Sequence, residues 1–441
     1  MIEQRSLAEE WQAAAKPLRS ADDLDELTAA CGDARVVLLG EASHGTSEFY
    51  VWRAELSRRL IQEKGFSIIA VEGDWPSCYE LNRYVRGIAD KEQNAKAVLR
   101  RSFNRWPAWM WANWEIAAFA EWLKGHNASI PAAKRVGFYG LDMYSLWDSM
   151  EAVIGFLEKR SPEEAEAAKE AMQCFQPYGG DEQQYGLMAS IVGGHCRDEV
   201  ARLLRDIRGN RPLYEEDPEG AFNVEQNARV ALHAEAYYRA MMGGGPESWN
   251  IRDRHMAETL EQLLAFGGPE AKVIVWEHNT HIGDARATDM AEEGMVNVGQ
   301  LLRERMKPED VYAVGFATHR GTVIAGRRWG APHAAMRVPE AMRGSWEDYM
   351  HRAGAFDQIA LLRSGTARRQ AMQAALGHRA IGVVYDPEHE RGNYVPTVLP
   401  ARYDAVIFID ESRALHPLSE ERESADGAQG GEPPDLYPWG F

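Results

Sequence analysis

The stretch VVLLGEASHGTSEFY, residues 36–50, places acid–base side chains directly after an apolar run. Glu41 and His44 lie in a short turn between two glycines. A serine nucleophile on a strand–turn–helix elbow needs the order G-x-S-x-G, because both glycines flank one sharp turn. The order here is G-x-x-S-x-G, and G-x-S-x-G occurs nowhere else in the chain. Ser43 is therefore out of register, and the turn presents Glu41 and His44 for chemistry.

Other apolar runs also end in ionisable residues. Glu72 ends the run FSIIAVEG, and His278 and His281 follow the run KVIVW. In open α/β sheets the carboxyl ends of the strands meet at one edge, where ligands bind. Taken together, these residues predict one convergent site. The spacing of the two later histidines is not the H-E-x-x-H of metalloproteases and is not a complete ligand set.

Arg53 lies within the apolar stripe of the helix predicted after the first turn. An arginine on a buried face needs a carboxylate partner, and Glu41 and Glu72 are candidates. The alternative is a side chain that extends to the edge of the face and reaches water. Three further residues near strand ends or in loops are assigned no catalytic role: Asp142, His319 and His389.

Short apolar, β-branched runs predict the strands, and helical patterns separate several of them. The predicted strands are 35–40, 66–73, 135–142, 272–278, 311–318, 322–326, 381–386 and 403–410. Most are continuous apolar runs, which favours an α/β fold with a mostly parallel central sheet covered by helices. Residues 318–321, THRG, are read as a hairpin that makes the sheet mixed at one side.

The predicted domain organisation is one catalytic domain with an inserted lobe. Residues 1–418 form the α/β domain, and residues 146–268, which contain no convincing strand, form a helical lobe within it. Residues 419–441 form a polar tail with an aromatic end.

Composition narrows the partners and the location. A net charge of −18 argues against nucleic acid or an anionic membrane as a partner. No apolar run approaches the roughly 20 residues of a membrane helix, and the first residues lack a secretion signal. The four cysteines have no C-x-x-C spacing, so we expect reduced thiols in a cytoplasmic protein. The composition does not predict the oligomeric state.

Large aromatic rings crowd the stretch RRSFNRWPAWMWANW, residues 100–114. Rings supply much contact area with few rotatable bonds. We therefore expect the four indoles to border the site as a wall for a sizeable apolar substrate: Trp106, Trp109, Trp111 and Trp114.

Five separated stretches resemble, in order, the motifs of the erythromycin esterase family: LLGEASHGTSEFYVWRAELSRRLIQEKGFSIIAVEGDWP, RVGFYGLDMYS, NARVALHAEAYYR, NIRDRHMAETL and VIVWEHNTHIGD. The resemblance extends from about residue 20 to the HPL at 416–418 and implies an α/β fold with a helical lobe over a deep cleft. It implies hydrolysis of a carboxylic ester or macrolactone. By position it implies a catalytic His44, supporting Glu41 and Glu72, an active-site Arg53, and the second pair His278 and His281. It does not identify the substrate, so macrolide cleavage and antibiotic resistance stay open.

The chemistry available predicts water as the nucleophile and His44 as its general base. Glu41 or Glu72 would hold the imidazole tautomer, and Arg53, His278 or His281 would stabilise the oxyanion or protonate the leaving group. The predicted partner is a small-molecule ester or lactone, with no cofactor and no metal. Two alternatives remain: a metal-dependent hydrolase that uses His44, Glu72, His278 and His281, or a non-enzymatic protein that binds a haem-like ligand.

Overall fold

The structure, a computed structural model, describes residues 7–88, 94–178, 182–192, 195–210, 216–363 and 370–418. Within these residues a nine-stranded sheet lies at the centre of the fold, in the order β1-β8-β11-β6-β2-β5-β3-β4, with β7 paired to β6. The strands are β1 Ala15–Pro17, β2 Val36–Leu39, β3 Ile68–Asp74, β4 Gly137–Asp142, β5 Val273–Trp276, β6 Val311–Gly326, β7 His333–Val338, β8 Gln358–Leu361 and β11 Ala405–Ser412.

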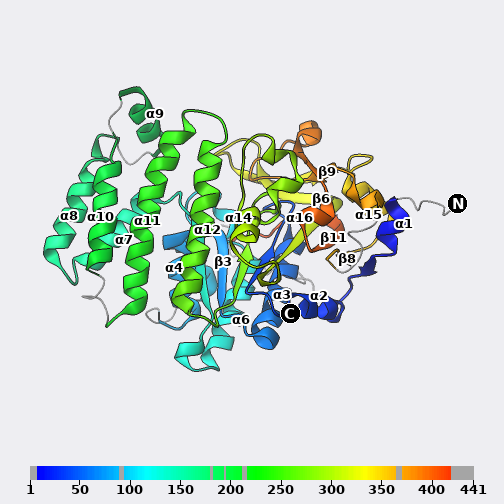
Figure 1. The fold of residues 1–441 in the computed structure, drawn as a ribbon, viewed down its shortest axis with the longest axis horizontal. Coiled ribbons are helices and arrows are strands. Elements are labelled where there is room, and N and C mark those ends of the chain that lie inside the picture. The colour runs from blue at the N-terminus through cyan, green and yellow to red at the C-terminus, as the bar shows by residue number, and fades with distance from the viewer. Residues whose placement is uncertain are drawn as a thin grey trace, which may run out of the picture.

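The run of strands from β11 to β4 is parallel throughout. The antiparallel pairs β8 with β11 and β1 with β8 lie on the other side of the sheet. The antiparallel strand β7 pairs with the second half of β6, on the edge that β2 occupies in the first half. Helices cover the sheet on both faces (Figure 1). The predicted mostly parallel α/β fold, mixed at one side, is confirmed.

Alternation along the strands sends side chains into two apolar clusters. On β5, Ile274 and Trp276 enter one cluster, whereas Val273 and Val275 enter the other. The first cluster is covered by α2 Asp25–Cys31, α3 Ser47–Lys64, α5 Ala95–Ser102 and α6 Trp114–Ala128. The second is covered by α1 Leu7–Gln12, α12 Glu247–Gly267, α14 Val298–Arg305, α15 Trp346–Ala353 and α16 Leu399–Arg402. Helix α4 Trp75–Val85 packs beside β4.

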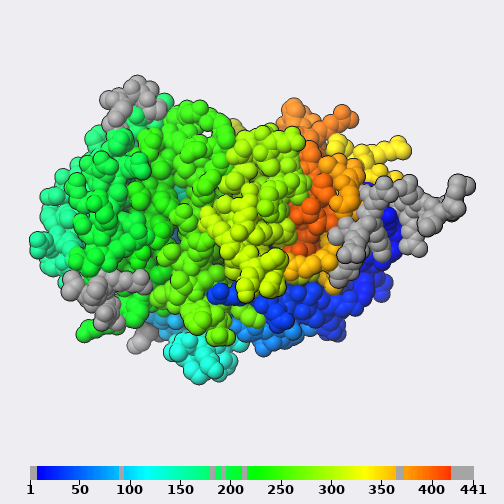
Figure 2. Space-filling view, viewed as in Figure 1, coloured from blue at the N-terminus to red at the C-terminus, as the bar shows by residue number. Residues whose placement is uncertain are grey.

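A third apolar cluster lies among the helices that follow β4. These helices are α7 Leu146–Leu157, α8 Pro162–Gln173, α9 Glu182–Val192, α10 Arg197–Gly209 and α11 Pro218–Met241. They form one end of the molecule, drawn from cyan-green to green in Figures 1 and 2. The inserted helical lobe at 146–268 stays a proposal. Helix α12 falls within that range but packs on the central sheet and not in the third cluster. The predicted tail at 419–441 lies outside the described residues.

The hairpin predicted at residues 318–321 is wrong. Strand β6 continues through it for 16 residues, pairing first with β2 and then with β7. Gly321 makes this continuation possible, because its φ is 139° and an added Cβ would lie 2.0 Å from the Ser412 carbonyl oxygen.

The strand predicted at 381–386 is also wrong. In this segment only isolated bridges form, from Ile381 to Ser43 and from Val384 to Gly326. The neighbouring residues instead make a separate two-stranded sheet, β9 Leu376–Arg379 with β10 Tyr394–Thr397. Within this run Ile381 and Tyr385 are buried, and Ile381 pairs with Ser43, whereas Val384 is exposed. Its hydrophobicity therefore reflects local packing and not a place in the central sheet.

The expectation of four reduced thiols is wrong. Cys174, after α8, and Cys196, before α10, form a disulfide with a Cα–Cα distance of 5.8 Å. Cys31 and Cys78 are free and buried. Helix α9 lies between the two bonded cysteines in the sequence. The cysteines are 22 residues apart and belong to no cysteine motif, so the sequence alone does not predict that they pair. In the part of the chain that the structure describes, no helix is long and apolar enough to span a membrane.

Candidate active site

The turn after β2 is held by close backbone packing at its two glycines. A Cβ on Gly40 would lie 2.1 Å from Asn279 Oδ1, and a Cβ on Gly45 would lie 1.9 Å from the Ile324 carbonyl oxygen. Helix α3 begins after Thr46, and Gly65 ends it with a φ of 72°. The turn is therefore fixed on both sides, and its side chains have defined positions.

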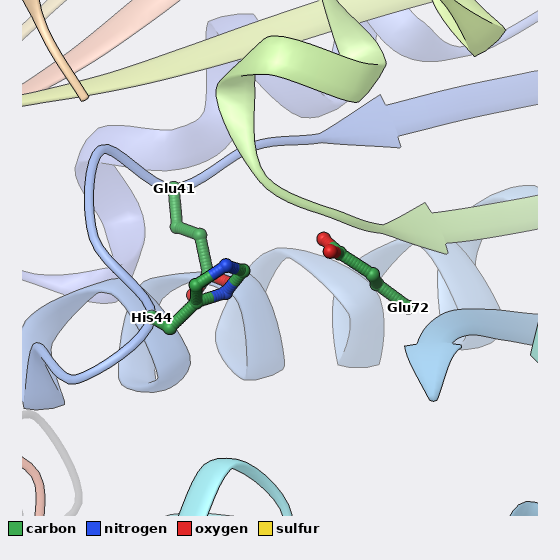
Figure 3. Close-up of side chains that lie close together, drawn as sticks. All are labelled: Glu41, His44 and Glu72. Atoms are coloured by element: carbon green, nitrogen blue, oxygen red, sulfur yellow. The ribbon is translucent and has the colours of Figure 1, made fainter. Parts of the chain in front are cut away.

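His44 and Glu41 form a buried pair within this turn. His44 Nδ1 lies 2.9 Å from Glu41 Oε1, and Arg53 Nη2 donates to Glu41 Oε2 at 2.7 Å. The imidazole lies against the Glu41 carboxylate, with Glu72 across from it (Figure 3). A carboxylate accepts, so Nδ1 carries the proton and the neutral ring keeps its lone pair on Nε2. Of the two alternatives left open for Arg53, the structure has the pairing with a carboxylate, that of Glu41.

Two opposing effects act on the pKa of His44. Burial alone lowers it, but the negative charges of Glu72 and Glu41 outweigh burial and raise the pKa above its ordinary value of 6.5. The ring therefore accepts a proton more readily than a free imidazole.

Arg53 itself is enclosed. Its guanidinium lies 4.4 Å from the centre of the Tyr50 ring and 4.9 Å from the Trp276 ring, and its side chain is 1% exposed. A group so enclosed cannot reach a substrate in this conformation. It neutralises and orients Glu41 instead.

Glu72, at the end of β3, is held by a second arginine. Arg252 Nη2 donates to Glu72 Oε1 at 2.7 Å, and the His278 backbone N–H donates to Oε2 at 2.8 Å. Arg252 also binds Asp142 through Nε at 3.0 Å and Nη2 at 2.6 Å. Burial raises the pKa of Glu72, but its close electrostatic contacts, among them the Arg252 guanidinium and the His278 N–H, lower it well below 4.5. Glu72 is therefore a fixed negative charge.

His281 uses both of its ring nitrogens. Nδ1 lies 3.0 Å from both oxygens of Asp253, and Nε2 lies 2.9 Å from Arg252 Nη1. Trp249 stacks on the ring with a centroid distance of 4.5 Å and an interplanar angle of 9°. The ring is fixed in position and in orientation.

His278 differs from His281. Its Nδ1 accepts from the Thr280 backbone N–H at 3.3 Å and lies 2.8 Å from the Thr280 hydroxyl, which then donates to the same nitrogen. This arrangement leaves the ring proton on Nε2. That Nε2–H is buried and has no hydrogen-bond partner among the described residues. The ring centre lies 4.9 Å from that of His44, and burial holds the pKa of His278 well below 6.5. His278 is thus a neutral hydrogen-bond donor whose ring lies beside that of the predicted base, His44.

Glu277 is an unexpected buried acid next to this histidine. The residue is 0% exposed, and neither carboxyl oxygen has a hydrogen-bond partner in the described part of the chain. Burial, together with the nearby charges of Glu72 and Asp253, raises its pKa well above 4.5. This raised pKa favours the protonated, neutral form of the acid.

The structure brings all six predicted site residues to one edge of the sheet and adds three that sequence reasoning missed: Asp142, Arg252 and Asp253. Asp142 had been assigned no role. Arg252 and Asp253 belong to NIRDRHMAETL, whose family resemblance was their one signal.

Three residues set aside earlier have other surroundings. Ser43 is 1% exposed and its hydroxyl pairs with that of Thr46. His319 stacks on His351 with a centroid distance of 3.8 Å, and the exposed His389 pairs with Asp386. None of these contacts involves the site.

Of the four indoles predicted to form a wall, Trp111 borders the site. Its Nε1 donates to the Glu72 carbonyl at 3.1 Å. Trp106 lies against the exposed Trp329, with a centroid distance of 4.5 Å. Trp109 lies in the apolar core and Trp114 packs against it. The predicted aromatic wall therefore stays a proposal, and of the four indoles Trp111 supports it.

Glu41, His44 and Glu72 each offer one atom to a cation, and these atoms lie within 4.8 Å of one another (Figure 3). Both carboxylates are already paired with guanidinium groups, Glu41 with Arg53 and Glu72 with Arg252. A bound cation would face two buried positive charges and would compete for oxygens in use. The donor set as arranged does not fit a resident metal ion.

A profile of the erythromycin esterase family matches residues 61–412. Erythromycin esterase type II of Escherichia coli is 23% identical over 69% of this chain and 74% of its own length. A crystal structure of a Bacillus cereus protein has a TM-score of 0.78 at 19% identity, covering 93% of this chain and 98% of that one. A structure of an erythromycin esterase mutant in its open conformation has a TM-score of 0.65 at 17% identity, covering 90% and 98%.

The fold and the match over most of the chain place the protein among the α/β hydrolytic enzymes. The chain belongs to the erythromycin esterase family. The profile match begins after Glu41, His44 and Arg53, so the geometry of that turn is evidence independent of it.

Proposed function

We propose that the protein hydrolyses a carboxylic ester or lactone by attack of a water molecule that His44 activates. The observation that carries this proposal is the His44–Glu41 pair, which keeps the proton on Nδ1 and leaves Nε2 as the base. The raised pKa of His44 suits proton abstraction near neutral pH.

His278 is the proposed oxyanion donor. Its Nε2–H is neutral, buried and without a partner among the described residues, and it lies beside the His44 ring. A pre-oriented donor of this kind stabilises the negative charge that develops on a carbonyl oxygen. After the carbon–oxygen bond breaks, His44, now protonated, returns its proton to the leaving alkoxide. Glu41 stabilises the imidazolium in the interval.

Family membership supports a small-molecule substrate, and the charge of −18 supports one that is not a nucleic acid. Macrolide cleavage and a role in antibiotic resistance go beyond family membership. A cytoplasmic location stays a prediction, and the Cys174–Cys196 disulfide weighs against it, because disulfides are rare in reducing compartments.

The direct test is a panel of esters and lactones, from small acyl esters to macrolactones, incubated with wild-type protein and with the His44→Asn variant. We expect hydrolysis of at least one substrate by wild type and its loss in the variant. Equal hydrolysis by both proteins would refute the proposal.

The metal-dependent alternative has one observation in its favour, the short distances among Glu41, His44 and Glu72. Exhaustive chelation separates it from the proposed route. We expect chelated protein to retain its activity, because the two carboxylates already have arginine partners. Activity that is lost on chelation and returns only with zinc or manganese would favour the metallohydrolase.

A further inference from the structure

A chain of contacts connects α12 to the carboxylate opposite His44. It runs from Asp253 to His281 at 3.0 Å, from His281 to Arg252 at 2.9 Å, and from Arg252 to Glu72 at 2.7 Å. His281 Nε2 also lies 3.5 Å from Glu72 Oε1, farther than the Arg252 donor. Every member is buried. No member of the chain touches His44, so its influence on the base passes through Glu72.

The middle of this chain has only one consistent arrangement of protons. Arginine donates and never accepts, so Nε2 of His281 must accept from Arg252. The ring proton then lies on Nδ1 and is donated to Asp253. Both nitrogens of His281 are in use, and the ring has no group left for an oxyanion or a leaving group.

We propose that Asp253 and His281 are positioning residues that fix Arg252 and, through it, the charge of Glu72 opposite His44. This proposal rests on the proposed function, in which His44 is the base. It replaces the direct catalytic role that the sequence analysis assigned to His281.

The far end of the chain is anchored to the backbone. The Val298 N–H donates to Asp253 Oδ1 at 3.1 Å, and Trp249 stacks flat on the His281 ring. Asp142 holds the other side of the Arg252 guanidinium. Arg252 and Asp253 therefore hold His281 in one tautomer together, since Arg252 donates to Nε2 and Asp253 accepts from Nδ1.

The Asp253→Asn variant tests this assignment. The amide oxygen can still accept from Val298, and the amide NH₂ then faces His281 Nδ1. Both Asp253 oxygens lie 3.0 Å from Nδ1, so in the variant one acceptor is replaced by an N–H donor and the negative charge is lost. The Nδ1–H of His281 is then held less firmly, and the contact of the ring with Arg252 weakens. We expect kcat to fall about 10–100-fold, the usual cost of losing an outer-shell partner.

A pH profile distinguishes positioning from a loss of fold. Displacement of Glu72 removes a charge that raises the pKa of His44, so the acid limb of kcat/KM moves to lower pH in Asp253→Asn. The exposed Asp206→Asn is the matched control and should leave both kcat and the limb unchanged. A limb in Asp253→Asn that stays in place or moves to higher pH would overturn the proposal.

A double mutant shows whether the chain acts through Glu72. In a Glu72→Gln background, Asp253→Asn should cost less than threefold, because its target is already gone. His281→Gln should retain more activity than His281→Leu, since an amide oxygen can accept from Arg252. Independent, multiplicative losses, or equal losses in both His281 variants, would show that His281 acts on the substrate directly. Should Asp253→Asn not fold, His281→Gln in the Glu72→Gln background gives the same test.

Failure of this inference is distinct from failure of the proposed function. An inactive, folded His44→Asn with multiplicative losses at Asp253 and Glu72 would reject only the positioning chain. A fully active His44→Asn would reject the base itself, whatever Asp253→Asn does.

Discussion

Two histidine clusters lie at the same sheet edge and are built from the same residue types. In one, His44 pairs with Glu41, which Arg53 holds. In the other, His281 pairs with Asp253 and also accepts from Arg252. The arginine touches the carboxylate in the first cluster and the imidazole in the second.

This difference decides what each ring can do. Where the arginine binds the carboxylate, the histidine keeps Nε2 as a base. Where the arginine binds the ring, the histidine has no lone pair left to offer. Residue type and burial therefore do not define a catalytic histidine, whereas the partner of its second nitrogen does.

The contrast between the two histidine clusters is tested most directly by replacing His44. His44→Asn keeps a polar side chain but cannot act as the base, so kcat should fall by about 10²–10⁴-fold. Circular dichroism and thermal unfolding should show an intact fold. Ser43→Ala is the control and should change kcat far less, because its hydroxyl pairs with Thr46. A dead but folded Ser43→Ala enzyme would contradict the water mechanism.

His278 tests the donor beside the base. In His278→Asn the shorter side chain can still cap the following turn but cannot place an N–H where Nε2–H lies. We expect kcat to fall about 10²–10³-fold with KM little changed, the cost of one oxyanion donor. Thr280→Val removes the hydroxyl 2.8 Å from His278 Nδ1 but keeps the backbone N–H that donates to the same nitrogen, so its effect should be smaller than that of His278→Asn. A loss that appears only in KM would assign His278 to substrate binding.

The pH dependence sharpens the contrast between a working base and a fixed ring. His44 must be neutral to act and its pKa is raised above 6.5, so kcat/KM should fall as pH drops through a value above 6.5. Glu72→Gln removes a charge that raises this pKa, so the acid limb should move to lower pH. The exposed Glu163→Gln should leave it in place. An unmoved limb in Glu72→Gln would show that another group titrates.

The smallest effect concerns stability and Glu277. Its acid is buried without a partner among the described residues, so Glu277→Met should raise the free energy of unfolding by about 1–3 kcal/mol. The folded pKa is raised, and stability therefore falls as pH rises from about 4.3, where the unfolded chain begins to ionise. The gain should be larger at pH 8 than at pH 5, as measured by urea unfolding. A gain independent of pH would mean that Glu277 does not stay protonated in the fold.

The sequence predicted the carboxyl-edge histidines and glutamates because each follows a visible apolar run. It could not place Arg252 and Asp253, which lie within a helix and meet Glu72 and His281 only through the fold. Arg252 and Glu72 are 180 positions apart. A charged residue in the middle of a helix is usually exposed to solvent. Only the burial of Arg252 and Asp253, which the structure gives, marks them as part of the site.

The errors in the fold have local causes. Residues 318–321 combine turn-forming types, but pairing with β7 and β11 carries β6 straight through them. In the run at 381–386, Ile381 is buried where it pairs with Ser43, but Val384 is exposed, so the apolar run does not mark a strand of the central sheet. The short strands β1, β8, β9 and β10 have three or four residues each, too few for a periodic pattern to stand out.

The place of β2 in the sheet has a consequence for how the chain reaches its fold during synthesis. Val36 of β2 pairs with Val273 on one side and with Val311 on the other. The turn that carries His44 leaves the ribosome early, yet its two neighbouring strands emerge more than 230 residues later. Contacts between such distant segments form slowly. The nascent chain therefore carries the apolar β2 run without its partner strands until those later segments are made, a stage at which chaperone binding would protect it from aggregation.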